Sequence, residues 1–249
     1  MLESFLKPMV FAHRGACKYA PENTLASFEL AVEQGADAIE LDVKLSADAE
    51  VMVIHDQTVE RTTEGAGEVN RLSLRELKEL DAGSHFGTSF KGEKIPTLDE
   101  VFESVGKRIF INVELTNYSS RQDDLIPLTA EIVKRHGLQK NLLFSSFAPI
   151  NLRRMKVLLP EVPVGLLALG GILGTVNRSM VYQKLSPGII HPYLKDVNAG
   201  LMARERRRSR RVHVWTVNGE PDLRRMNELG VDGVFTDDPL TALRVLERK

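Results

Sequence analysis

The residues best suited to chemistry lie in the first quarter of the chain. His13 closes one apolar run and His55 follows another, while Glu40 and Asp42 lie within a third run between them. A β-strand sends residues i and i+2 to the same face, so Glu40 and Asp42 project together. Two adjacent carboxylates repel by a few kcal/mol at an effective dielectric constant of about 20, and they persist as a pair most readily around a cation. Imidazole readily exchanges a proton near neutral pH, so these four residues indicate metal-assisted acid–base chemistry.

The rest of the sequence predicts a framework that brings such strand ends together. Strand-like apolar runs alternate with helix-like segments over nearly the whole chain, which is typical of a parallel α/β sheet. The predicted strands are residues 9–13, 38–43, 108–114, 141–145, 162–167, 188–191, 212–217 and 233–236. Eight strands, each followed by a helix, and a length of 249 residues predict one TIM (β/α)8 barrel domain over residues 1–249.

Capping residues mark several helix boundaries. Asn23 is positioned to cap a helix over residues 24–34, which stops at Gly35. The other marked boundaries are Asp123 and Gly137 for one helix, Pro221 and Gly230 for another, and Pro239 at the start of the last.

Residues 56–97, referred to below as the insertion, interrupt the alternation because they are too long for an ordinary βα connection. They contain a short helix announced by Ser73 and Glu76, and a loop rich in Gly, Ser and Phe. The insertion leaves the carboxyl end of the second barrel strand, where barrels carry their active sites, so we expect an inserted cap beside the pocket. A surface loop with no role in function is the alternative.

In a barrel, the candidate residues gather at one mouth. His13 and Arg14 end the first strand, Glu40 and Asp42 lie on the second, and Glu114 ends the third. Three carboxylates from neighbouring strands form an oxygen-rich site suited to Mg²⁺, Ca²⁺ or Mn²⁺. Zinc would prefer nitrogen or sulfur ligands, which Cys17 alone does not supply. The alternative is a buried ion-pair cluster with Arg14, which would be costly for three anions against one cation.

The other histidines fit structural roles. His85, His136 and His213 are interpreted this way, His136 because a positive charge suits the last turn of a helix. His191 ends a strand and is able to approach the mouth, but the residues next to it in the sequence do not indicate a catalytic or metal-binding role.

Composition narrows the class of protein. A formal net charge of −1 predicts neither nucleic acid nor an anionic membrane as a partner. The arginine-rich run over residues 204–211 is expected to form a solvated face, with a phosphate-binding patch as the alternative. A single cysteine excludes an intramolecular disulfide. The amino terminus lacks a signal-peptide pattern, and the longest apolar stretch, residues 162–173, is too short to span a bilayer. We therefore expect a cytoplasmic protein without membrane insertion; the sequence does not indicate an oligomeric state.

Taken together, several short motifs resemble the glycerophosphodiester phosphodiesterase family over essentially the whole chain. The motifs are His13-Arg14-Gly15, Pro21-Glu22-Asn23-Thr24, Glu40-Leu41-Asp42-Val43, His55-Asp56, Arg61-Thr62-Thr63, Leu80-Asp81-Ala82-Gly83-Ser84, Gly92-Glu93, Ile95-Pro96-Thr97-Leu98, Asn112-Val113-Glu114, Val214-Trp215-Thr216-Val217-Asn218 and Thr236-Asp237-Asp238-Pro239. The resemblance implies a TIM barrel with a small insertion after the second strand. It also implies hydrolysis of glycerophosphodiesters to glycerol 3-phosphate and an alcohol.

The resemblance assigns roles to particular residues. His13 and His55 match the acid–base pair of the family, and Arg14 matches a phosphate-binding arginine. Trp215 matches a residue that walls the glycerol end of the pocket. The residues that match its metal ligands, usually to Mg²⁺ or Ca²⁺, are Glu40, Asp42 and Glu114.

Two departures from the family pattern stand out. Thr116 occupies the position where many members carry a lysine near the phosphate, so a positive charge is missing there. Residues 48–50 replace an Asp-Gly turn before His55, which is expected to change only turn geometry.

Other functions remain open at this stage. A lysophospholipase D type enzyme would need an apolar channel, for which Phe86, Phe90 and residues 166–173 are candidates. A non-catalytic barrel that holds a phosphodiester would not need an acid–base pair. A Rossmann dinucleotide enzyme is disfavoured because the first βα turn has one glycine, Gly15, and no G-x-G-x-x-G motif.

Overall fold

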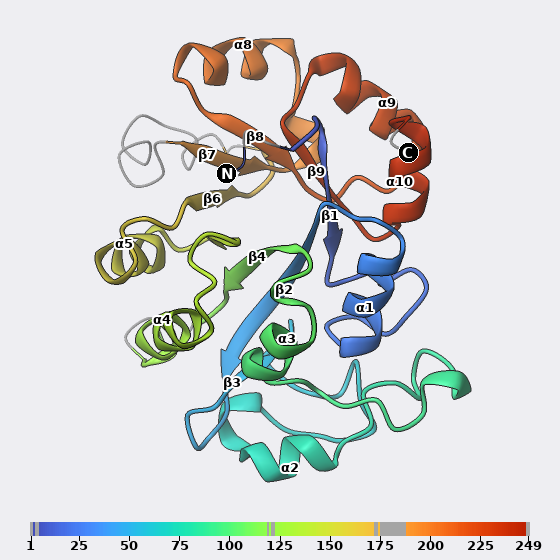
Figure 1. The fold of residues 1–249 in the computed structure, drawn as a ribbon, viewed down its shortest axis with the longest axis vertical. Coiled ribbons are helices and arrows are strands. Elements are labelled where there is room, and N and C mark those ends of the chain that lie inside the picture. Colours follow the sequence, from blue (N-terminus) through green and yellow to red (C-terminus); the bar gives the residue numbers. More distant parts are fainter. Residues whose placement is uncertain are drawn as a thin grey trace.

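Eight parallel strands close into a barrel, as the sequence predicts. The computed structural model describes residues 2, 5–118, 120, 123–171, 174 and 188–247. The order of neighbouring strands is β1-β9-β8-β7-β6-β5-β4-β2, and a pairing of β1 with β2 completes the circle (Figure 1). The barrel strands are β1 (Met9–His13), β2 (Ala38–Leu45), β4 (Phe110–Leu115), β5 (Leu142–Ser146), β6 (Val164–Ala168), β7 (Ile189–Pro192), β8 (Arg211–Val214) and β9 (Gly233–Thr236).

Helices lie around the outside of the strands (Figure 1). They are α1 (Leu25–Glu33), α2 (Leu74–Glu79), α3 (Leu98–Val105), α4 (Leu125–His136), α5 (Pro149–Leu158), α8 (Ala199–Arg207), α9 (Glu220–Leu229) and α10 (Pro239–Val245), with short 3-10 turns η2 (Val69–Arg71), η3 (Thr88–Phe90) and η4 (Leu194–Asp196). Within the described ranges, no helix combines the length and the apolar character that crossing a bilayer requires.

The register of the strands sets polar residues at one level of the barrel. His13 on β1 lies opposite Glu40 on β2. Asp42, two residues further along β2, lies opposite Glu114 on β4. Opposed residues on paired strands are close neighbours on one face, so these side chains converge near the carboxyl ends of the strands.

A ninth strand, β3 (Val51–Val53), lies outside the barrel and runs antiparallel to β2. The sequence indicates this apolar run but does not place it in a hairpin. The amide of Ile54 donates a hydrogen bond of 3.0 Å to the carbonyl of Asp42. Because of this pairing, His55 is returned to the level of the carboxylates on β2.

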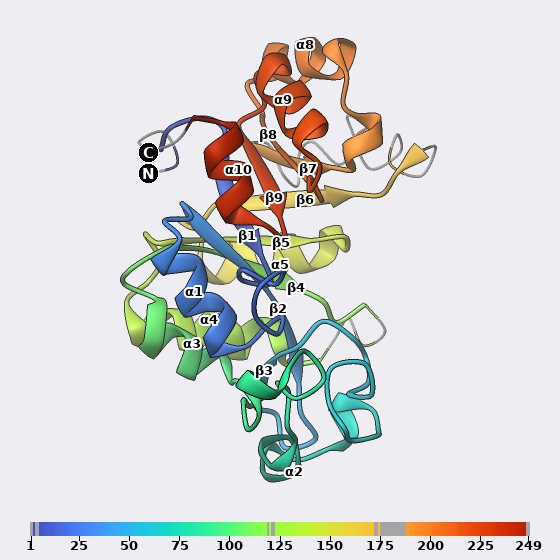
Figure 2. The same cartoon turned by 90° about the vertical axis from the view of Figure 1, so that its right-hand side faces the viewer.

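The insertion has a small core of its own. Figure 2 shows it, with α2 at its far edge, extending from one end of the molecule. Its buried core includes Val59, Val69, Leu77 and Ile95, which pack with Met52 of β3. The predicted short helix is α2, and Ser73 and Glu76 form its capping box.

The prediction that Asn23 caps the first helix is wrong by one residue. Thr24 is the N-cap of α1, and its hydroxyl accepts a hydrogen bond from the amide of Ser27. Asn23 adopts a φ of 56° and donates its side-chain amide to Asp42 instead. The expected end of α9 at Gly230 and the expected start of α10 at Pro239 are confirmed.

The basic run near the end of α8 is only partly a solvated face. Arg206 and Arg207 are exposed, as expected. Arg210, however, is buried and pairs with the fully buried Glu205 at 3.1 Å. An unpaired buried carboxylate would be costly, so part of the run has a structural role.

Two histidines fill the barrel interior as neutral rings. His191 and His213 are fully buried, with their ring centroids 5.2 Å apart. Burial lowers the pKa of both imidazoles, to about 3 for His213. His213 packs against Phe11 and His191 against Phe235, and neither histidine lines the pocket that contains Glu40 and Glu114.

The turn after β1 depends on Gly15, which has a φ of +83°. A Cβ atom at this position would lie 2.3 Å from Ser27 Oγ and 2.7 Å from the backbone carbon of Ser27. Gly35 has a similar φ of +79°, but a Cβ there would meet nothing within 4 Å. Adding a Cβ at Gly35 therefore reports the cost of a left-handed backbone alone, whereas adding one at Gly15 reports that cost together with a steric clash.

We expect Gly35→Ala to lower the free energy of unfolding by about 1–2 kcal/mol, the cost of a left-handed conformation with a Cβ. Gly15→Ala should lower it by about 3 kcal/mol or more, because overpacking against Ser27 adds to that cost. Urea denaturation of both variants measures the difference. Equal losses would show that the contact with Ser27 does not constrain this turn.

Candidate active site

Three carboxylates meet at the carboxyl ends of β2 and β4. Glu40, Asp42 and Glu114, referred to below as the carboxylate cluster, each offer an oxygen within 4.8 Å of the others. Glu40 and Asp42 are 3% and 1% exposed, and Glu114 is half-buried. The prediction that alternation on β2 brings Glu40 and Asp42 together is confirmed.

Negative charge exceeds positive charge around this cluster. Burial, followed by repulsion from neighbouring carboxylates, raises the pKa of Glu40 and of Glu114. Arg14 compensates in part: its backbone amide donates to Glu40 Oε2 at 3.0 Å, and its Nε lies 3.5 Å from Asp42 Oδ2. One guanidinium cannot balance three closely spaced carboxylates, so Arg14 alone does not neutralise the site.

Two neighbours that the sequence analysis missed hold the cluster in place. Asn23 donates from Nδ2 to Asp42 Oδ2 at 3.0 Å. The hydroxyl of Tyr118 donates to Glu114 Oε1 at 2.6 Å. The position of Tyr118, just beyond β4, was the available signal, since residues after a barrel strand return to the mouth.

The donor set fits a hard divalent cation. All three groups offer carboxylate oxygens, the ligands that Mg²⁺ and Ca²⁺ prefer. Among the described residues, Asn112 Oδ1 is buried without a hydrogen-bond partner, and Asn112 lines the same pocket as Glu40 and Glu114. A cation would relieve the repulsion that raises the pKa values of the carboxylates.

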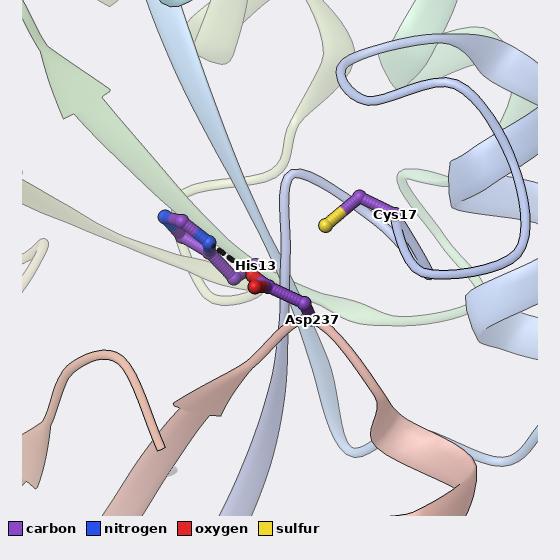
Figure 3. A group of neighbouring side chains, drawn as sticks. All are labelled: His13, Cys17 and Asp237. Carbon is purple, nitrogen blue, oxygen red and sulfur yellow. Dashed lines mark hydrogen bonds and ion pairs between the residues drawn. The ribbon is translucent and has the colours of Figure 1, made fainter. Parts of the chain in front are cut away.

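His13 lies between this cluster and a further carboxylate. Its Nδ1 lies 2.7 Å from Asp237 Oδ1 (Figure 3). Its Nε2 lies 4.0 Å from Glu40 Oε2. Asp237 accepts a hydrogen bond of 2.6 Å from Asn218. Burial opposes ionisation of Asp237, but the hydrogen bond from His13 lowers its pKa overall. This arrangement favours the tautomer with the proton on Nδ1 and a free Nε2.

The sequence analysis did not assign a role to Asp237, although it follows the last strand directly. Barrel closure pairs β9 with β1, so the residue after β9 lies beside the residue that ends β1. The thiol of Cys17, on the loop after β1, lies within 4.8 Å of a carboxylate oxygen of Asp237. Burial and the negative charge of Asp237 raise the pKa of this thiol.

His55 is held by a carboxylate in the same way. Its Nδ1 lies 2.6 Å from Asp56 Oδ1, and Arg61 pairs with the other oxygen of Asp56. Arg61 also contacts Glu22 through two hydrogen bonds of 2.7 and 2.8 Å. Hydrogen bonds from Arg61 lower the pKa of Asp56 to about 2.

The network continues into the barrel. Glu22 accepts a hydrogen bond of 2.9 Å from Arg14. Burial opposes ionisation of Glu22, yet Arg61 and Arg14 lower its pKa to about 2. Alternating charges therefore link the insertion to the carboxylate cluster.

One pocket joins the candidate residues. Its polar side includes both histidines, Arg14 and two members of the cluster, and its apolar side is formed by Phe147, Leu167, Trp215 and Phe235. Trp215 donates from Nε1 to the carbonyl of His191 at 2.8 Å, and its ring packs edge-on against Phe147. The arrangement can hold an anion beside a cation, with two imidazoles in reach.

Thr116, which stands where many family members carry a lysine, has a lysine from another strand beside it. Lys44, at the end of β2, donates from Nζ to Thr116 Oγ1 at 2.7 Å. It is 8% exposed, and burial lowers its pKa against the opposing effect of Asp42 and Glu114. Lys44 follows Glu40 and Asp42 at the spacing that gives one face of a strand, so the sequence contained this signal.

Comparisons with known proteins agree with this geometry. The sequence model of the glycerophosphoryl diester phosphodiesterase family matches residues 13–241. A glycerophosphodiester phosphodiesterase of Caldanaerobacter subterraneus is 38% identical over 98% of this chain and 99% of its own length. One of Bacillus altitudinis is 34% identical over 96% of this chain and 98% of its own.

A solved structure gives the same relationship. A phosphodiesterase of Oleispira antarctica, determined in complex with the product sn-glycerol-3-phosphate, superposes with a TM-score of 0.89 at 34% identity and covers 99% of each chain. Fold and sequence thus agree along nearly the full length of the chain. The protein belongs to the glycerophosphoryl diester phosphodiesterase family.

Proposed function

We propose that this protein hydrolyses glycerophosphodiesters to glycerol 3-phosphate and an alcohol, with a divalent cation as cofactor. The observation that carries the proposal is one pocket lined by His13, His55 and two members of the carboxylate cluster, in a member of this family. The names of its relatives, and the product bound to the Oleispira antarctica enzyme, support the same substrate class.

His13 and His55 act as the acid–base pair. Each imidazole has a carboxylate at Nδ1, which leaves Nε2 as the nitrogen that exchanges a proton with substrate. One removes a proton from the attacking water or substrate hydroxyl, and the other protonates the departing alkoxide. In-line displacement requires the two rings on opposite sides of the phosphorus.

The charged side chains bind and orient the diester. Glu40, Asp42 and Glu114 hold the cation, Mg²⁺ or Ca²⁺, with Mn²⁺ as an alternative. When bound, the cation would stabilise the negative charge that develops on the phosphoryl oxygens in the transition state. Arg14 contacts the phosphate, and Lys44 adds positive charge on the side of Thr116.

The apolar side of the pocket receives the glycerol. Trp215 packs against its carbon chain and is fixed by the hydrogen bond to the carbonyl of His191. The insertion acts as a cap on a single barrel domain, because it begins directly after His55 and pairs with Glu22 through Arg61.

An acylated substrate has less support. Phe86 and Phe90, the expected channel residues, pack edge-to-face against each other and do not line the pocket. Leu167 does line it, but residues 172 and 173 of the expected channel lie outside the described residues.

A panel of glycerophosphodiesters with EDTA, Mg²⁺, Ca²⁺ or Mn²⁺ tests the proposal. We expect glycerophosphocholine to be hydrolysed much faster than lysophosphatidylcholine, and activity to be lost in EDTA and restored by a cation. Phosphorus NMR distinguishes glycerol 3-phosphate from a cyclic phosphate. Binding of the diester without turnover under any cation would instead indicate a non-catalytic barrel.

His13→Ala or His55→Ala should each reduce kcat at least ~100-fold, the usual scale for loss of a general acid or base. His85→Ala, at an exposed position of the insertion, is the matched control and should keep full activity. Steady-state kinetics on folded protein measures both. Full activity in either of the first two variants would contradict the assignment.

The cation should bind more tightly as pH rises. Burial and neighbouring carboxylates raise the pKa of Glu40, and they raise the pKa of Glu114 to about 8, so protons compete with the cation for these oxygens. A fixed excess of Ca²⁺ should therefore raise Tm more at about pH 8 than at about pH 6. Asp42→Asn should remove most of this increase, whereas Asp99→Asn, outside the pocket, should not. A pH-independent increase would argue against protonated carboxylates.

A further inference from the structure

A second cluster of metal-binding side chains lies on the other side of the His13 ring. His13 Nδ1, Cys17 Sγ and a carboxylate oxygen of Asp237 all lie within 4.8 Å of one another. Figure 3 shows the sulfur of Cys17 directed from its loop toward the pair formed by His13 and Asp237. All three residues are half-buried, so solvent and ions have access. We refer to them as the His–Cys–Asp cluster.

The chemistry of this cluster differs from that of the carboxylate cluster. It offers one nitrogen, one sulfur and one oxygen, whereas the other site offers only carboxylate oxygens. Imidazole and thiolate are the ligands that Zn²⁺ prefers, and Mg²⁺ and Ca²⁺ avoid sulfur. We propose that His13, Cys17 and Asp237 form a separate Zn²⁺ site, and that Zn²⁺ bound there inhibits the enzyme by occupying Nδ1 of His13.

The geometry requires only small movements. Zinc bonds of about 2.0–2.3 Å in a tetrahedral arrangement separate neighbouring ligand atoms by roughly 3.3–3.7 Å. The three donor atoms already lie within 4.8 Å of one another, and the 2.7 Å contact between His13 and Asp237 must widen by about 0.6–1 Å. Three protein ligands and one water molecule complete the coordination.

Binding rearranges protons in a defined way. The thiol of Cys17 releases its proton to solvent as sulfur bonds to the metal. Asp237 exchanges its hydrogen bond with His13 for a bond to the metal. At the imidazole the metal replaces the proton on Nδ1, and the neutral ring then carries a proton on Nε2. In total, one Zn²⁺ binds to the protein, the thiol proton of Cys17 leaves to solvent, and the His13 ring carries one proton before and after binding.

This rearrangement disables His13. With a proton on Nε2 the ring cannot accept another from the nucleophile, and as a neutral metal-bound ring it is a poor acid toward the leaving alkoxide. The inhibition rests on the proposed function, but the binding of Zn²⁺ does not. The two parts are therefore tested separately.

Binding is measured with Co²⁺ as a spectroscopic probe for Zn²⁺, on the full chain with excess Mg²⁺ to fill the carboxylate cluster. We expect one equivalent of Co²⁺ to give a thiolate-to-cobalt charge-transfer band, which Zn²⁺ abolishes by displacement. The chain has a single cysteine, so the band reports Cys17 alone. Cys17→Ser keeps a hydrogen-bond donor toward Asp237, and it should lose the band and at least ~100-fold in Zn²⁺ affinity.

A matched control removes an imidazole from a similar pair without sulfur. His136 Nε2 lies 2.7 Å from Asp99 Oδ1, with no cysteine in the rest of the chain to complete a site. His136→Gln should keep both the band and the Zn²⁺ affinity. Absence of the band in the unaltered protein, or equal Zn²⁺ affinity in Cys17→Ser, would overturn the site.

Inhibition is measured as diester hydrolysis with excess Mg²⁺ and increasing Zn²⁺. Cys17→Ser should keep its basal kcat and need at least ~10-fold more Zn²⁺ for half-inhibition. Equal inhibition of both proteins would refute inhibition through this site, even with the band present. If no diester is hydrolysed under any cation, the proposed function fails, and the cobalt spectrum still decides whether the site exists.

Discussion

Excess negative charge buried at the mouth of the barrel is the constraint on which the site depends. Three carboxylates share a space that one guanidinium enters, and burial raises the pKa of two of them. A cluster of this kind is costly unless another positive charge joins it. The neighbours of the cluster fit that requirement: Asn23 and Tyr118 hold two of the carboxylates, and Lys44 stands at the edge. The same charge imbalance makes the site suitable for a divalent cation and an anionic substrate together.

The two histidines of the pocket are oriented by the same kind of contact, a hydrogen bond between Nδ1 and a carboxylate. Each has a carboxylate at Nδ1, from the end of β9 for His13 and from the adjacent residue for His55. Each carboxylate is in turn held by a donor, Asn218 in one case and Arg61 in the other. Such contacts fix both the orientation and the tautomer of an imidazole, so both rings can direct Nε2 to the pocket.

Backbone pairing and the charge network together explain how a strand outside the barrel and a long insertion become part of the site. β3 pairs with β2, and the hydrogen bond from Ile54 to the carbonyl of Asp42 returns His55 to the level of Asp42. Arg61 then joins the insertion to Glu22, and Glu22 joins Arg14. Individual surface ion pairs contribute little, but a network of bidentate, partly buried pairs can hold one geometry.

The sequence by itself determined the fold class, the positions of the barrel strands and the pairing of Glu40 with Asp42. These follow from local periodicity, because alternation along a strand fixes which side chains share a face. Only the tertiary structure brought Asp237 to His13, 224 residues away, and with it Cys17. It also moved Asn23 from the expected helix cap to Asp42, and set Lys44 beside Thr116. Those contacts depend on barrel closure and on turn conformations, which join distant segments and which no local pattern specifies.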